Sequence, residues 1–224
     1  MRMAAQALAS TVFGIAFFGV ALFVPAGTIH YWQAWIFVAV FAVTTIVPSV
    51  VLAARYPDAL ARRMKAGPTA ESRPVQRIII TLTVVLVFAT LALSALDHRF
   101  GWSSVPTWLI IAGNLAVAIG LSIAQLVIVQ NNYAAATIRV EADQPMVSTG
   151  LYGLVRHPMY LGTMIMMIGI PPALDSLWGL LGVAVAVPVL AARILDEEKM
   201  LDAELAGYRE YTHQVRYRLI PGVW

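Results

Sequence analysis

Long apolar stretches without acidic or basic side chains alternate with short polar segments along this chain. Asp, Glu, Lys and Arg are absent from residues 3–54, 78–96, 100–138, 157–174 and 176–192. A helix needs about 20 apolar residues to cross a hydrocarbon core of about 30 Å. Because the first run is long enough for two helices, the pattern predicts five or six membrane-crossing helices. Their expected ranges are roughly 7–25, 31–54, 77–96, 105–130, 157–171 and 176–198.

The last two apolar runs differ from the others because each is slightly short for a full crossing. Only the segment Pro171-Pro172-Ala173-Leu174-Asp175 joins them. We therefore expect a tight helical hairpin that is tilted or does not fully span the bilayer. In such a hairpin, the beginning of the first helix and the end of the second lie on the same side.

The composition indicates an all-α integral membrane protein, since 60% of the 224 residues are hydrophobic and only 12% are charged. A soluble domain of this size does not need so much apolar surface. With six crossings, the basic residues of 55–77, of 139–156 and from Arg193 onward fall on one side, and only Arg99 lies on the other. The positive-inside rule makes the basic side cytoplasmic and places both termini there.

Composition also narrows the chemistry. Membrane orientation and attraction to anionic lipid explain the formal net charge of +3 without a nucleic acid partner. The histidines His30, His98, His157 and His213 show no paired metal-ligand spacing, so we expect no metal site. The chain has no cysteine, which excludes disulfides and thiolate chemistry. It also lacks a phosphate-binding P-loop and the G-x-G-x-x-G motif of dinucleotide-binding folds.

A first cluster of polar side chains lies where the fifth apolar run begins. Arg156, His157 and Tyr160 surround Pro158, and proline is favoured at the first position of a helix. His157 is therefore the expected N-cap. The free N–H groups and the dipole of a helix N-terminus favour a carboxylate or a phosphate there. The alternative interpretation is that Arg156 and His157 only flank the membrane interface.

A second cluster, Arg193, Glu197 and Glu198, lies at the end of the last apolar run. Arg193 and Glu197 are four residues apart and share a helix face. One interpretation is a surface ion pair that contributes well under ~1 kcal/mol. The other is a functional site, because ionisable groups at membrane depth are costly. Since the hairpin brings the two clusters to the same side, we predict one site at the membrane surface.

Two polar segments lie near this site. A loop as long as residues 131–156 is a candidate functional segment. The tail 199–224 continues the last helix with an amphipathic stripe that we expect to fold back over the loop. The stripe consists of Leu201, Leu205, Tyr208 and Tyr211.

The two clusters belong to a longer sequence pattern. Its parts are M-V-S-T-G-L-Y from Met146 to Tyr152, V-R-H-P-M-Y-L-G from Val155 to Gly162, Arg193 with Glu197-Glu198, and finally Tyr208, Tyr211 and Pro221. This combination resembles the isoprenylcysteine carboxyl methyltransferase family, whose superfamily also includes membrane phospholipid methyltransferases. The resemblance covers about residues 137–222, and the earlier helices are similar only in hydropathy.

The resemblance implies S-adenosylmethionine (SAM) as the methyl donor, held in a cytoplasmic pocket between the hairpin and the C-terminal segment. It implies that Arg193 binds the carboxylate of the methyl acceptor and that Arg193 and Glu197 are the catalytic residues. The implied cofactor-binding residues are Gln144, Pro145, Met146, Val147, Tyr152, His157, Pro158, Met159, Tyr160 and Glu197. Family members often have histidine where this chain has Gln144.

The sequence therefore predicts an integral-membrane, SAM-dependent methyltransferase, most like a protein-S-isoprenylcysteine carboxyl O-methyltransferase. The bilayer would supply a lipophilic, prenylated acceptor. We expect residues 1–130 to form N-terminal transmembrane helices and residues 131–224 to form the methyltransferase core.

Three alternatives remain at this stage. The first is methyl transfer to nitrogen or sulfur of a phospholipid or small molecule. The second is an NADPH-dependent reductase of the membrane sterol type, which needs more basic groups than Arg139 and Arg156 in the 131–156 loop. The third is a small non-enzymatic transporter, which needs polar residues near the bilayer midplane rather than at one surface.

Overall fold

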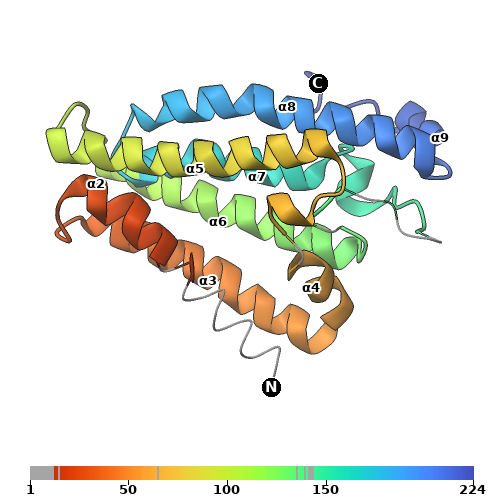
Figure 1. Cartoon of the computed structure of the whole chain (residues 1–224), viewed down its shortest axis with the longest axis horizontal. Coiled ribbons are helices and arrows are strands. Elements are labelled where there is room, and N and C mark those ends of the chain that lie inside the picture. The colour runs from red at the N-terminus through yellow and green to blue at the C-terminus, as the bar shows by residue number, and fades with distance from the viewer. Residues whose placement is uncertain (1–12, 15, 65, 135, 139, 141–143) are drawn as a thin grey trace.

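The computed structural model describes residues 13–224 except 15, 65, 135, 139 and 141–143, and these described residues form helices and loops without a strand. Long helices lie alongside one another in one bundle (Figure 1). They are α3 (Trp32–Arg55), α5 (Pro74–Phe100), α6 (Thr107–Gln130), α7 (Pro158–Ala173) and α8 (Gly179–Glu204). The shorter elements are η1 (Gly19–Phe23), α2 (Val24–Ala26), α4 (Pro57–Met64), η2 (Pro68–Ala70), η3 (Gly150–Gly153) and α9 (Tyr208–Gln214).

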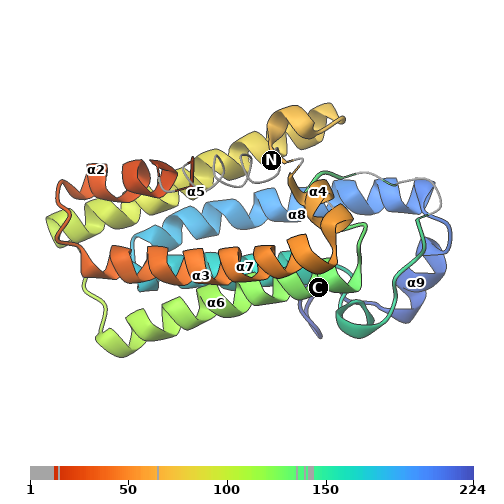
Figure 2. The ribbon, with the colours of Figure 1, turned by 90° about the horizontal axis from the view of Figure 1, so that it is seen from below.

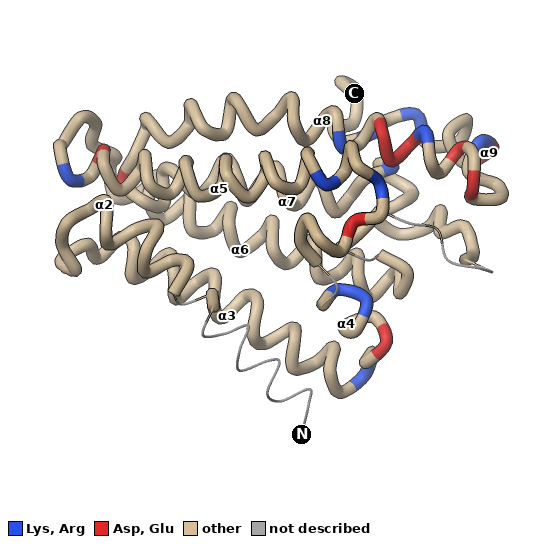
Figure 3. Tube along the Cα trace, in the orientation of Figure 1, with Lys and Arg blue, Asp and Glu red and all other residues tan. Residues whose placement is uncertain are grey.

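The helices α3, α5, α6 and α8 are long and apolar enough to cross a membrane. Charged residues gather at the two ends of the bundle and leave the middle of the long helices without charge (Figure 3). The chain is therefore a multi-pass integral membrane protein, as predicted. The helix expected at 7–25 begins outside the described residues, and its described part belongs to a shorter apolar helix, Ala16–Ala26.

The predicted hairpin consists of α7 and α8. Its second helix, expected over 176–198 and slightly short for a full crossing, runs from Gly179 to Glu204 and is long enough to cross a membrane. The turn of the hairpin also differs from the prediction. The sequence placed Pro171 and Pro172 in the connection, whereas both lie in the last turn of α7. The N–H groups of Leu174 and Asp175 donate to the carbonyls of Ile170 and Pro172, respectively. These bonds close the helix after the prolines, which have no N–H of their own to satisfy.

The helices α6 and α7 are antiparallel and pack backbone to backbone through glycines. A Cβ atom at Gly120 would lie 2.3 Å from the Gly162 carbonyl oxygen, and one at Gly169 would lie 2.6 Å from that of Gly113. Small residues permit this approach between membrane helices. The contact holds the beginning of α7 beside the end of α6.

The C-terminal segment packs over the beginning of α7. Tyr208, Tyr211 and Val215 form a buried cluster against Met146 and Tyr152, together with Leu201 and Leu205, as the amphipathic stripe predicted. The backbone N–H groups of Arg156 and His157 donate to the carbonyls of Tyr217 and Arg218, both at 2.9 Å. Figure 2 shows α4 and α9 toward the end of the bundle that is opposite α2.

Candidate active site

A pocket lies at this end of the bundle, where α7, α8 and α9 meet the loop that follows α6. Its lining contains every residue that the resemblance assigned to the cofactor, and it also contains Arg193. These cofactor residues are Gln144, Pro145, Met146, Val147, Tyr152, His157, Pro158, Met159, Tyr160 and Glu197. The fold thus brings three separate sequence segments to one cavity, while the function of each residue stays a prediction.

Tyr160 connects the two predicted catalytic residues. Its hydroxyl donates to Glu197 Oε2 and accepts a hydrogen bond of 2.9 Å from Arg193 Nε. The surface ion pair considered for Arg193 and Glu197 is therefore replaced by a bridge through a tyrosine. All three side chains line the pocket, so the bridge fixes their mutual orientation there.

Arg193 is buried among further partners that the sequence did not indicate. Its Nη1 donates to Gln76 Oε1 at 2.9 Å, and its Nη2 donates to Glu71 Oε1 at 3.3 Å and to the Ala136 carbonyl at 3.2 Å. With the bond to Tyr160, four of its five N–H groups are engaged. Among the described residues, one N–H of Arg193 therefore has no partner. Bidentate hydrogen bonding to a carboxylate would require Arg193 to exchange one of its present partners.

Glu71 is a buried carboxylate that sequence analysis missed. It is 1% exposed, pairs with Arg193, and its Oε2 accepts the Ile138 N–H at 3.2 Å. The only available signal was an acidic residue within the basic segment 55–77. Its burial means that the segment before α5 is part of the wall behind the site.

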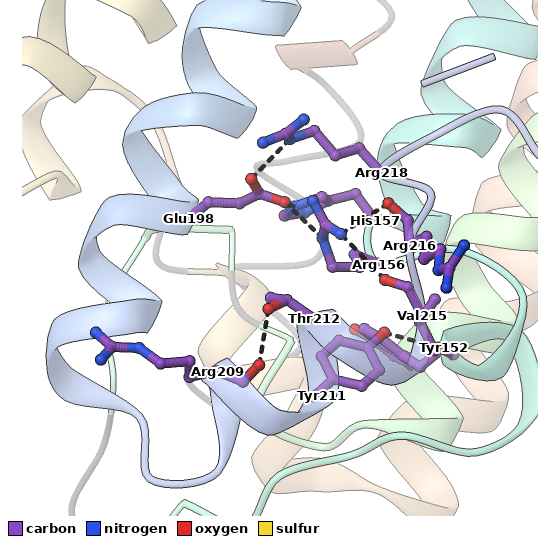
Figure 4. Close-up of polar contacts among 10 residues, drawn as sticks. All are labelled: Tyr152, Arg156, His157, Glu198, Arg209, Tyr211, Thr212, Val215, Arg216 and Arg218. Atoms are coloured by element: carbon purple, nitrogen blue, oxygen red, sulfur yellow. Dashed lines mark hydrogen bonds and ion pairs between the residues drawn. The ribbon is translucent and has the colours of Figure 1, made fainter.

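Glu198 contacts Arg156, His157 and Arg218 (Figure 4), none of which bonds to its neighbour Glu197. Its Oε1 accepts from Arg156 Nε at 2.8 Å and lies 3.2 Å from His157 Nε2, and its Oε2 accepts from Arg218 Nε at 2.7 Å. Arg156 Nη1 also donates to the Val215 and Arg216 carbonyls. Glu198 therefore connects α7, α8 and the C-terminal segment.

The beginning of α7 offers fewer free donors than the sequence predicted. The His157 N–H donates to Arg218, Pro158 has no N–H, and the Leu161 N–H donates back to the His157 carbonyl. Within the described part of the chain, the N–H groups of Met159 and Tyr160 remain as the helix N-terminal donors. An anion at this helix end would therefore bind the N–H groups two and three residues after the expected N-cap.

Three tyrosines of the pocket keep their hydroxyl protons. Burial raises the pKa of Tyr152 to about 12, although Asn131 Nδ2 donates to its hydroxyl at 3.2 Å. Burial also raises the pKa of Tyr208 and of Tyr211. The Tyr211 hydroxyl donates to the Tyr152 carbonyl at 2.6 Å, whereas the buried Tyr208 hydroxyl has no partner among the described residues. Tyr208 lines the pocket and thus carries a buried hydroxyl that no described residue satisfies.

Two comparisons with known proteins match membrane methyltransferases. The family model described as phospholipid methyltransferase matches residues 108–206, from the start of α6 to just beyond α8. Over its whole length, the chain resembles the solved structure of the eukaryotic intramembrane Ras methyltransferase ICMT, an isoprenylcysteine carboxyl methyltransferase. That match has a TM-score of 0.54, covers 88% of the other chain and shows 15% sequence identity, so it establishes the fold alone.

A curated relative has a different activity. The Delta(14)-sterol reductase TM7SF2 of Mus musculus is 33% identical over 91 residues, which are 39% of this chain. The chain spans only 22% of that protein's length. The family match and the shared fold support the resemblance that the motifs indicated, and the match begins earlier in the chain than the motifs did.

Proposed function

We propose that this chain transfers a methyl group from SAM to the carboxylate of a lipophilic acceptor. The observation that carries the proposal is the single pocket surrounded by all ten predicted cofactor residues, from the segments 144–147 and 152–160 and from Glu197. The family match and the fold support methyl transfer, and the motifs together with the ICMT fold favour a carboxylate acceptor.

The chemistry of the pocket suits SAM, which carries an ammonium, a sulfonium and a carboxylate. Glu197 and the faces of Tyr152 and Tyr160 suit the two cationic groups. The N–H groups of Met159 and Tyr160 at the start of α7 suit the carboxylate. A polar group of the ligand would also satisfy the Tyr208 hydroxyl, whose burial without a partner is otherwise unfavourable.

The pocket encloses about 110 Å³. Pockets for ligands the size of a drug or cofactor usually enclose about 300–1,000 Å³, so this one must widen when SAM binds. The segment 144–147 and α9 form its outer wall and are the parts that can move without separating the membrane helices.

Bound SAM supplies a methyl group on a positively charged sulfur. A carboxylate oxygen of the acceptor forms the new bond to that methyl carbon, the carbon–sulfur bond breaks, and its electrons go to sulfur. No proton is transferred, so the protein acts by orienting the acceptor and excluding water. In our proposal, Arg193 orients the carboxylate through its remaining N–H, and Tyr160 holds Arg193 in place.

The distribution of charges supports an orientation in the membrane. We propose that the pocket and both termini face the cytoplasm, since the basic residues gather at the pocket end. The bilayer then delivers a prenylated acceptor laterally, and soluble SAM enters from the cytoplasm. In this proposal residues 131–224 remain the methyltransferase core, to which Glu71 and Gln76 add support from residues 1–130.

Two other functions have a specific observation in their favour. The first is methyl transfer to the amine of a phospholipid, since the matching family model is described as phospholipid methyltransferase. An amine acceptor would have to lose a proton, and Glu197 is the available base. The sterol reductase relative favours NADPH as the ligand. Among the described loop residues, however, Arg156 is already engaged by Glu198 and two carbonyls.

Calorimetric titration of detergent-purified protein with S-adenosylhomocysteine, with NADPH as the comparison, tests the proposal. We expect saturable binding of S-adenosylhomocysteine alone. Glu197→Gln should weaken it about tenfold to a hundredfold, because a charge-assisted contact contributes about 1.5–3 kcal/mol. Glu204→Gln, an exposed change on the same helix, should leave the affinity unchanged. Binding of NADPH alone would favour a reductase, and binding of neither compound would refute both functions.

A further inference from the structure

A second cavity adjoins the pocket and shares Met159, Tyr160 and Arg193 with it. It encloses about 240 Å³ and reaches Arg63 of α4. Given the proposed function, on which this inference rests, we infer that the second cavity holds the methyl acceptor. We infer further that Arg63 is a specificity-determining residue that binds the acceptor's carboxylate together with Arg193. Arg63 lies outside the residues 108–206 that the family model matches.

The packing of α4 directs Arg63 toward the cavity. Ala59 and Leu60 of α4 pack with Leu52 and Ile128 and with Met159 of α7. Arg63 is four residues after Ala59 and therefore on the same helix face. Its Nη1 donates to Met159 Sδ at 3.4 Å, so the guanidinium reaches a residue that lines both cavities.

Two guanidinium groups on one cavity favour an anionic ligand. Burial lowers the pKa of Arg63, and the positive charge of Arg193 lowers it further, although Tyr160 opposes this. A carboxylate between Arg63 and Arg193 would offset the repulsion between the two positive charges. Most N–H donors of Arg193 are engaged by other residues, so Arg193 by itself cannot hold both carboxylate oxygens. In our inference, Arg63 donates the second hydrogen bond to the carboxylate.

The rest of the lining favours an amphiphile. Leu121, Ala124 and Met166 contribute apolar side chains from α6 and α7. The cavity is larger than an apolar cavity of about 150 Å³ that binds benzene, so it has room for a carboxylate with several attached carbons. The acceptor's reacting oxygen would then lie near Tyr160, where the two cavities meet.

Calorimetry with a matched pair of acceptor probes tests this assignment. The probes are an N-acetyl-S-isoprenylcysteine and its carboxamide, each titrated into protein saturated with S-adenosylhomocysteine. We expect wild-type protein to prefer the carboxylate. Arg63→Gln should weaken carboxylate binding about tenfold or more and leave carboxamide binding unchanged. Arg63→Lys should lose less, because it keeps the charge, and the exposed Arg55→Gln should lose nothing.

The outcomes separate this inference from the proposed function. Equal affinities of wild-type protein and Arg63→Gln for the carboxylate would overturn the inference, as would an equal loss for both probes. Wild-type protein that binds S-adenosylhomocysteine but not the carboxylate would also overturn it and would leave methyl transfer standing. Failure of wild-type protein to bind S-adenosylhomocysteine would instead refute the proposed function. If Arg63→Gln does not fold, an unchanged carboxylate preference in Arg63→Lys and Arg63→Met would be the contradicting result.

Discussion

Glu197 and Glu198 are neighbours in α8, yet Glu197 lines the pocket and bonds to Tyr160, whereas Glu198 binds Arg156, His157 and Arg218. Successive helix positions point about 100° apart, so the two carboxylates face different surroundings. One glutamate is thus available for ligand chemistry, and the other holds the C-terminal segment on α7. Substitution of Glu197 should therefore affect ligand binding, whereas substitution of Glu198 should affect the stability of the fold.

Glu198→Gln should lower the free energy of unfolding by more than it lowers the binding free energy of the cofactor to the folded protein. Removing the charge leaves the buried Arg156 without its counter-ion, which costs about 3 kcal/mol. Thermal unfolding in detergent should show a clearly lower Tm than that of wild-type protein or Glu197→Gln. An unchanged Tm would mean that the contacts shown in Figure 4 do not contribute to the stability of the fold.

Tyr160→Phe should reduce turnover about 10- to 100-fold while S-adenosylhomocysteine binds within a few-fold of wild type. The variant keeps the ring and removes the hydroxyl between Glu197 and Arg193, and each of these charge-assisted hydrogen bonds contributes about 1.5–3 kcal/mol. Steady-state assays with a carboxylate acceptor measure the loss. Tyr217→Phe, at a half-exposed side chain, is the matched control. Equal activity of both variants would show that the Tyr160 bridge is not needed for turnover.

Arg193→Ala should abolish turnover of a carboxylate acceptor and also destabilise the protein by about 3–5 kcal/mol, because Glu71 is left buried without its partner. Arg193→Ala combined with Glu71→Gln should recover much of that stability but none of the turnover. Thermal unfolding and a methylation assay on both variants separate the two effects. Turnover by the double variant would contradict a role for Arg193 in binding the acceptor.

Gly120→Ala should destabilise the protein by about 1–3 kcal/mol, since its Cβ would meet the Gly162 carbonyl and Met166 backbone of the neighbouring helix. Gly19→Ala, where a Cβ has open space, is the control and should be neutral within about 0.5 kcal/mol. Thermal unfolding of both variants is the measurement. A tolerated alanine at Gly120 would mean that α6 and α7 can move apart at little cost.

The sequence predicted the convergence of the two clusters because an antiparallel hairpin places Pro158 and Glu197 at the same end. It predicted the tail from the spacing of Tyr208 and Tyr211. It did not reveal Glu71 or Gln76 as partners of Arg193. Periodicity identifies the buried face of each helix, but it carries no information on which helices become neighbours across more than one hundred residues.

The glycine contacts between α6 and α7 have a consequence for the rate of ligand exchange. Separating these helices would lose the close backbone packing that the glycines permit, so we expect this half of the site to be stiff. The opposite wall is held by the Tyr211–Tyr152 bond and by the contacts of Arg156 with residues 215–217. If the pocket binds SAM as we propose, release of the spent cofactor should wait on the detachment of the C-terminal segment. Shortening that segment should then speed release while weakening binding.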